Sequence, residues 1–172
     1  LFCSLLFFLA PALSEPPPTA AEILHSLEKL EQLGYEVRQQ EIRGGSTIVR
    51  TRKNNKNEGK LVILSKNQKV LSINEFKDDQ RVGTWKWWTE EGQLIREVQF
   101  SNDLRHGATR TWYPGGSKMS EVNYNKDKRV GFERFWYDDG KLKEEIPYQD
   151  GLKHGTSKHW DQEGKLREST PW

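Results

Sequence analysis

The second half of the sequence repeats itself every 24 residues, without insertion or deletion. We number the positions of each unit from its opening glycine, which is Gly83, Gly107, Gly131 or Gly155. Position six is tryptophan, position ten is a second glycine and position eighteen is aromatic, with Phe100, Tyr124, Tyr148 and Trp172 at the last. A degenerate fifth unit precedes these four, with Gly59, Leu64 and Phe76 at positions one, six and eighteen. Self-similarity at a fixed period predicts a repeat architecture.

Each unit is predicted to form one β-hairpin. In the first unit, one strand covers about residues 84–89 and the other about residues 94–100, with Glu91-Gly92 as the tight turn. No helix fits inside a 24-residue unit so rich in turns. The predicted fold class is all-β: an elongated single-layer antiparallel sheet of repeated β-hairpins, preceded by one short helix. Each unit should advance the sheet by about 9.6 Å, so that five units extend about 48 Å.

Positions four and six of each unit should lie on one face, because side chains alternate along a strand. Position four is always basic, so that a basic ladder and an indole ladder are expected side by side. A cation over an indole contributes about 0.5–1 kcal/mol at an exposed site. We expect the indoles to form a thin core and the exposed margins to bind partners. The candidate binding residues of these rows are Lys86, Trp88, Arg110, Trp112, Arg134, Trp136, Lys158 and Trp160.

Residues 1–14 are predicted to be a signal peptide. The segment is almost entirely apolar but too short to span a membrane, and Ala12-Leu13-Ser14 fits the rule for cleavage near Ser14/Glu15. Residues 15–18 form a proline-rich linker, which should be stiff and extended. The expected location is therefore secreted or periplasmic, in the cell envelope. Cleavage would remove Cys3, the one cysteine of the sequence, and with it any disulfide.

Residues 19–34 are predicted to form an amphipathic helix. Thr19 and Glu22 have the spacing of a capping box, and Gly34 is suited to end the helix. Apolar residues such as Ile23 and Leu27 recur at helical spacing on one side. We expect this helix to cover the open end of the sheet.

Residues 35–82 are predicted to form basic β-hairpins that include the degenerate repeat. Residues 35–69 contain nine basic and three acidic side chains, a net charge of +6. Arg50, Arg52 and Lys53 are its candidate binding residues. Two interpretations stay open: a solvated strand face protected by charges, or a dedicated site for anions.

The whole chain carries 27 basic and 25 acidic residues, a formal charge of +2, which does not favour a nucleic-acid-binding surface along the whole chain. No apolar run reaches the roughly 18–20 residues of a transmembrane helix.

His106 and His154 are two repeats apart, about 19 Å, too far to share a metal. Adjacent carboxylates such as Glu144/Glu145 point to opposite faces and do not converge. We therefore expect no enzyme, cofactor or metal site.

The pattern of unit three resembles the MORN-repeat variant family. It is carried by Gly131, Trp136, Gly140, Leu142, Glu145, Tyr148, Gly151, His154 and Gly155. The resemblance covers residues 83–172 well and 59–82 weakly, and unit two departs from it with Lys118 and Met119 in place of leucine. It implies a hairpin sheet used for binding or scaffolding, and association with membranes, anionic lipids and protein assembly. Many bacterial members of the family are labelled antitoxin components.

Together these features predict a secreted or periplasmic, non-enzymatic scaffold. It would bind another protein, or its own copies, through a sheet edge and the aromatic and basic rows. One alternative is an envelope-associated module that holds anionic lipid or polysaccharide with residues 35–69. A third is an antitoxin or immunity protein.

Overall fold

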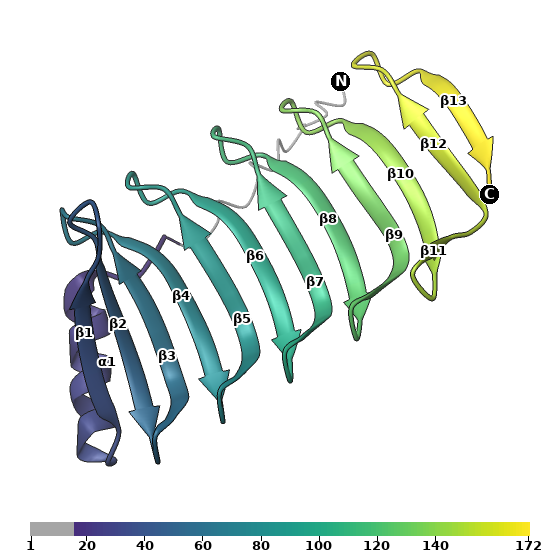
Figure 1. The fold of residues 1–172 in the computed structure, drawn as a ribbon. Coiled ribbons are helices and arrows are strands. Elements are labelled where there is room, and N and C mark those ends of the chain that lie inside the picture. The colour runs from purple at the N-terminus through teal and green to yellow at the C-terminus, as the bar shows by residue number, and fades with distance from the viewer. Residues whose placement is uncertain (1–15) are drawn as a thin grey trace, which may run out of the picture.

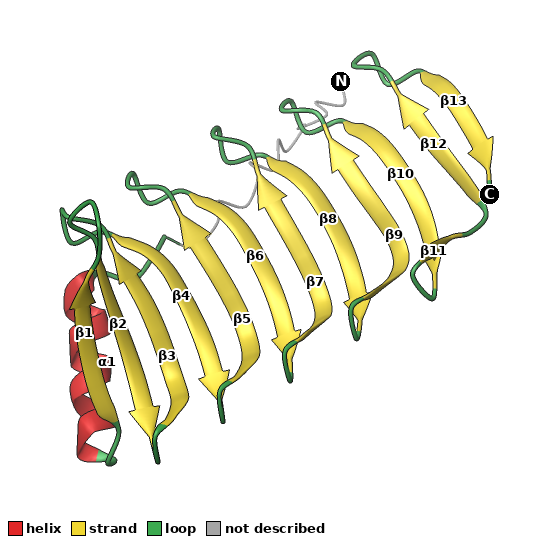
Figure 2. Cartoon of the chain, in the orientation of Figure 1, coloured by secondary structure: helices red, strands yellow, loops and turns green. Residues whose placement is uncertain are grey.

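The computed structural model describes residues 16–172, which form one helix and a single antiparallel sheet of thirteen strands (Figures 1 and 2). The strands lie side by side in chain order from β1 to β13, except that the short β11 pairs only with β10. The predicted fold class is confirmed. The elements are α1 (Ala20–Gln32), β1 (Glu36–Glu41), β2 (Thr47–Lys53), β3 (Lys56–Leu64), β4 (Val70–Lys77), β5 (Gln80–Trp88), β6 (Leu94–Ser101), β7 (Leu104–Trp112), β8 (Lys118–Asn125), β9 (Lys128–Trp136), β10 (Leu142–Gln149), β11 (Leu152–Lys153), β12 (Thr156–Trp160) and β13 (Leu166–Pro171).

The 24-residue spacing extends further toward the N-terminus than the sequence pattern indicated. Two-residue turns recur at residues 54–55, 78–79, 102–103, 126–127 and 150–151, and all ten of these residues have positive φ. Such turns match the twist of the strands they join, and they favour Asn, Asp and Gly. At the opposite ends of the strands, the tight turns contain Gly92, Gly116, Gly140 and Gly164. These glycines have φ of 82° to 86°, as predicted for the tight turns. Gly44, two periods before Gly92 and in the turn between β1 and β2, also has positive φ, at 93°, so that this hairpin is built like a repeat.

The glycine that opens each unit lies inside a strand, so that the first strand of each hairpin begins before it. β5 begins at Gln80, about four residues earlier than predicted. At Gly107 the backbone has φ of 98°, and the register between β6 and β7 shifts, which marks a β-bulge. The Gln99 side chain fills this bulge and accepts a hydrogen bond from the Ala108 N–H at 2.7 Å. A Cβ at Gly107 would overlap the Gln99 amide oxygen, so that only glycine fits.

The two faces of the sheet carry different rows of the repeat. Residues directly opposite in an antiparallel pair share a face. The face that we name the helix face carries positions four, six, twelve and fifteen, including Lys86, Trp88, Leu94 and Glu97. The other, the reverse face, carries positions one, sixteen and eighteen, such as the row-sixteen residues Val98, Val122 and Ile146, which are buried.

Helix α1 packs on the helix face at the N-terminal end of the sheet (Figure 1). Its predicted capping box is present, since the Thr19 side chain accepts from the Glu22 N–H and the Glu22 carboxylate accepts from the Thr19 N–H. Ile23 and Leu27 are buried on its apolar side. They form the main core with residues from β2 to β6: Val49, Val62, Leu64, Val70, Trp88 and Leu94.

Candidate binding surfaces

The basic row at position four is an ion-pair row. Each cation lies opposite a position-fifteen residue, and Glu97, Glu121 and Glu145 occupy that position in the first three units. Arg110 bridges two of these carboxylates, at 2.9 Å from Glu97 and 2.7 Å from Glu121. The sequence analysis placed this basic row but overlooked the glutamates opposite it, which neutralise most of its charge. Further pairs join Lys86 to Glu97 at 3.9 Å and Arg134 to Glu145 at 2.7 Å.

The ion pairs shift the titration of their members. The hydrogen bond to Glu121 is the main cause that raises the pKa of the Arg110 guanidinium. Burial by itself raises the pKa of the Glu121 carboxyl, but hydrogen bonds from Arg110 and Lys118 outweigh it and leave that pKa below its usual value. Both groups therefore stay charged at neutral pH.

The tryptophan row is buried at one end and half-buried along the rest. Trp88 is only 5% exposed because α1 covers it, whereas Trp112, Trp136 and Trp160 are half-buried. In residues 16–172, no cation–π contact joins a position-four cation to the tryptophan of its own unit. Arg134 instead lies 4.9 Å from the ring of Phe132. The cation over Trp136 is Lys118, at 5.1 Å, the residue that departs from the family pattern.

The character of rows four and fifteen changes along the sheet. Beneath α1 these rows are apolar: Val62 stands at position four, and Val49 and Ile73 at position fifteen. Beyond the helix the same rows carry the ion pairs. The sequence therefore places apolar residues where the helix face is covered and charged residues where it is not.

A third row, on the reverse face, was missed by the sequence analysis. A cation two residues before each opening glycine lies over the position-eighteen ring of the following strand. That ring stands opposite the glycine in the register, as Phe100 does Gly83. The pairs are Arg81–Phe100 at 4.5 Å, Arg105–Tyr124 at 4.0 Å, Arg129–Tyr148 at 5.0 Å and Lys153–Trp172 at 3.8 Å.

Turn aspartates hold the first two of these arginines in place. Asp103 accepts hydrogen bonds from the backbone and side chain of Arg81, and Asp127 does the same for Arg105. These bonds hold the pKa of both aspartates below the usual value, mainly through the backbone N–H at Asp103 and the side chain at Asp127. The 24-residue spacing of the cations was the signal that could have revealed this row.

The three candidates of the basic hairpin do not form one site. Arg50 and Arg52 lie on the reverse face, where they line a hollow with Arg38. Lys53 belongs to the helix face, where its ammonium lies 4.7 Å from the ring of Tyr35 and donates to the Leu33 carbonyl at 3.3 Å. Lys53 thus ties the end of α1 to the sheet, and Arg38 replaces it in the basic cluster.

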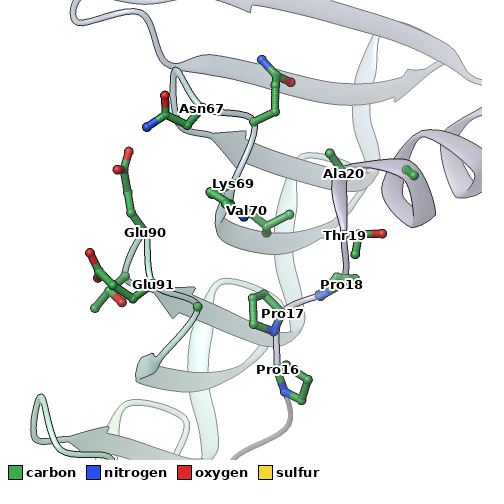
Figure 3. Close-up of a pocket in the computed structure, with 14 residues that line it drawn as sticks. Pro16, Pro17, Pro18, Thr19, Ala20, Asn67, Lys69, Val70, Glu90 and Glu91 are labelled. Atoms are coloured by element: carbon green, nitrogen blue, oxygen red, sulfur yellow. The ribbon is translucent and has the colours of Figure 1, made fainter.

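A hollow lies where the proline run crosses two tight turns (Figure 3). Its volume is about 540 Å³, and its walls are the segment 16–21 and the turns 67–70 and 89–92. Figure 3 shows Glu90 and Glu91 extending from their turn away from the prolines. A hydrogen bond with the Thr89 side chain lowers the pKa of Glu91, so that this carboxylate is ionised and not poised as a general acid.

Within residues 16–172, no three His, Cys, Asp or Glu side chains gather in a group that could hold a metal ion. The same part of the chain contains no helix that is both long and apolar enough to cross a membrane.

The fold and its rows define a repeat protein whose unit is a 24-residue β-hairpin stacked into one open sheet. The chain belongs to the MORN repeat variant family, whose repeats are modules that bind proteins or lipids: the family matches residues 81–102, 105–126, 129–150 and 153–172. The four matched segments begin at the reverse-face cations Arg81, Arg105, Arg129 and Lys153. A comparison with curated proteins finds no significant match.

Proposed function

We propose that this protein is an exported, non-enzymatic scaffold that binds a partner protein on the helix face of its C-terminal half. One observation carries the proposal. Leu94 and Leu166 occupy the same position of the repeat, yet Leu94 is 5% exposed beneath α1 and Leu166 is 47% exposed. The surface that α1 covers thus continues beyond the helix, where no segment between residues 16 and 172 covers it.

The uncovered surface carries both apolar and basic side chains, which indicate the kind of partner that it would bind. Trp160 and Leu166 lie opposite each other, and Phe132 on the same face is 42% exposed. Lys158 faces Ser169, where the other units have glutamate, and on its other side Glu145 pairs with Arg134, so that Lys158 makes no ion pair with a described residue. The partner should therefore offer apolar side chains flanked by carboxylates, which complement both features.

Export and the lack of enzymatic activity rest on the sequence. The predicted signal peptide, residues 1–14, lies outside the described residues, which begin at Pro16. The register supports the argument against paired carboxylates, because Glu144 faces Phe135 on the reverse face and Glu145 faces Arg134 on the helix face. The candidate acids of this pair therefore lie on opposite sides of the sheet.

The proposal is tested by capture from the native envelope with matched variants. Wild type, the double variant Phe132→Asp/Leu166→Asp and the control Trp172→Asp are compared by affinity purification and mass spectrometry. Trp172 is also exposed, at 56%, but belongs to the reverse-face row. We expect one protein that wild type and control retain and the double variant loses. Equal recovery by all three would contradict the docking surface, and recovery of this chain itself would indicate self-assembly.

A second candidate function is the binding of anionic lipid or polysaccharide by residues 35–69, whose net charge is +6. The arginine-lined hollow of this segment favours it. Such binding should weaken sharply as salt is added, because salt screens exposed charges, whereas an apolar interface should respond little. Liposome co-sedimentation across ionic strengths separates the two. An antitoxin role remains a proposal that co-expression with a neighbouring toxin would test.

A further inference from the structure

The first hairpin forms a hollow on the reverse face whose charged lining is entirely basic. The hollow measures about 490 Å³ and lies over β1, β2 and the start of β3. The residues that line it are Arg38, Gln39, Gln40, Arg50, Arg52 and Asn57; Gln39 stands opposite the core residue Val49, so that its side chain belongs to the helix face. Lys53, the third residue expected from the sequence, lies on the other face and takes no part.

The register brings the three guanidinium groups to one place. Arg38 lies directly opposite Arg50, and Arg52 lies two residues further along the same strand. Opposite residues have Cβ atoms about 4.5–5.5 Å apart, and neighbours on one face of a strand are about 7 Å apart. Like charges directly opposite each other destabilise a sheet. One carboxylate, Glu36, stands opposite Arg52 on the same face, so that the hairpin gathers three guanidinium groups around a single counter-charge.

The repeats show how this chain otherwise treats arginine. Every arginine from Arg81 to Arg167 contacts a carboxylate or lies over an aromatic ring. In the hollow, only Arg38 has such a partner, Glu36, at 2.7 Å. The guanidinium of Arg52 bonds to the Asn55 carbonyl, and that of Arg50 makes no ion pair, hydrogen bond or ring contact with any described residue.

We propose that this hollow binds a phosphoryl group. Guanidinium groups hold phosphate oxygens through paired N–H donors, and a dianion would neutralise the charges of Arg50 and Arg52. The amide of Gln40 is a further donor at the wall. The inference rests on the second candidate function, to which it adds the site and the chemical group. It is independent of partner binding on the helix face. The phosphoryl group can belong to a soluble phosphate ester or to a lipid headgroup.

A charge-conserving variant distinguishes a built site from the general positive charge of the segment. Arg38→Lys/Arg50→Lys/Arg52→Lys keeps the net charge but removes the paired donors. Lys66→Gln removes one charge from an exposed turn outside the hollow and serves as the control. Isothermal titration of the full chain with pyrophosphate at low salt should show binding by wild type and by Lys66→Gln. The triple lysine variant should bind at least about tenfold more weakly, as expected when bonds to a charged group are lost.

Vesicles identify the source of the group. Co-sedimentation with phosphatidylcholine vesicles that contain phosphatidic acid supports a lipid headgroup if the triple variant fails to sediment. Binding of pyrophosphate without vesicle binding supports a soluble ester. Unchanged binding by the triple variant, in both assays, overturns the site while leaving the second candidate function intact. No binding by wild type in either assay overturns the phosphoryl site. If a sulfated polysaccharide is bound instead, the second candidate function stands without phosphate, and if it is not bound either, that function is overturned as well. Thermal unfolding of each variant verifies that it is folded.

Discussion

The covered and uncovered halves of the helix face share one backbone design but differ in two rows of side chains. Under α1, positions four and fifteen hold Val62, Val49 and Ile73, which pack against the helix or the residues beneath it. Beyond α1, the same positions hold pairs such as Arg110 and Glu121. The backbone hydrogen bonds of the sheet do not depend on which side chains stand at positions four and fifteen. The repeat can therefore carry apolar residues there where a helix covers the face and charged residues where no described segment does.

This difference in side chains indicates how a single-layer sheet remains folded without a second layer. A buried aliphatic side chain contributes about 1.5–3 kcal/mol, whereas a half-exposed ion pair contributes about 0.2–1 kcal/mol. We therefore expect the N-terminal half to be the more stable part and the C-terminal half to depend on the ladders of both faces. Stability in repeat arrays is approximately the sum of such local terms.

The largest expected effect comes from the helix contact. Leu27→Ala should lower the free energy of unfolding by about 2–5 kcal/mol, because Leu27 is buried among the residues of the main core. Leu166→Ala, the same chemical change at the uncovered end, should lower it by less than about 0.5 kcal/mol. Urea unfolding of both variants measures the difference. Equal losses would mean that the two halves are not distinguished by the helix.

A smaller difference is expected between two glycines at the same position of the repeat. Gly107→Ala forces a side chain into positive φ and onto Gln99, whereas Gly131→Ala meets no atom within 4 Å and incurs only the backbone penalty. We expect losses of about 2–3 kcal/mol and about 1–2 kcal/mol, respectively. Urea unfolding tests the order. A greater loss at Gly131 would show that the Gln99 contact is unimportant.

The ion-pair row should contribute less, and its contribution should depend on pH. The folded-state pKa of Glu121 lies below the usual 4.5, so its stabilisation is present above that value. The contribution is lost as pH falls through the lower folded-state pKa. Glu121→Gln should remove about 0.2–1 kcal/mol at pH 7 and reduce the loss of stability below about pH 4.5. Urea unfolding at pH 7 and pH 3 measures both. An unchanged difference between wild type and variant at the two pH values would contradict this role.

An effect of similar size is expected on the reverse face. Arg105→Gln removes the cation above Tyr124 together with its exposed ion pair to Asp127, and should lower stability by about 0.5–1 kcal/mol. Lys77→Gln, at the end of β4, is the control because Lys77 is exposed and makes no such ring contact in the described chain. Thermal unfolding compares the two. A larger loss from Lys77→Gln would exclude the cation–π row as a source of stability.

The sequence predicts the hairpins well because turn chemistry and strand alternation are both local. The period of 24 and the glycines at position ten place one turn of every unit correctly. The rows that involve neighbouring strands were harder to predict. Glu97 lies eleven residues from Lys86 in the sequence, and only the register makes them opposite. The bulge at Gly107 shifts the register between β6 and β7, and the side chain that fills it, Gln99, comes from the neighbouring strand.

The candidate site was predicted in part for the same reason. Positions four and six were placed correctly on one face, but the carboxylates opposite them were overlooked. Arg50 and Lys53 were grouped by sequence proximity, although side chains three residues apart on a strand point to opposite faces. The coverage by α1 depends on long-range packing, which alternation and composition do not specify.

Hydroxyl-radical footprinting of the free chain and of its complex with the captured partner tests the central claim most directly. In the free chain, Phe132 and Leu166 should react faster than Leu94, because α1 shields only the last. In the complex, protection should appear at Phe132, Trp160 and Leu166 and be absent at Trp172. Protection confined to the reverse face, or equal reactivity of Leu94 and Leu166 in the free chain, would contradict the account.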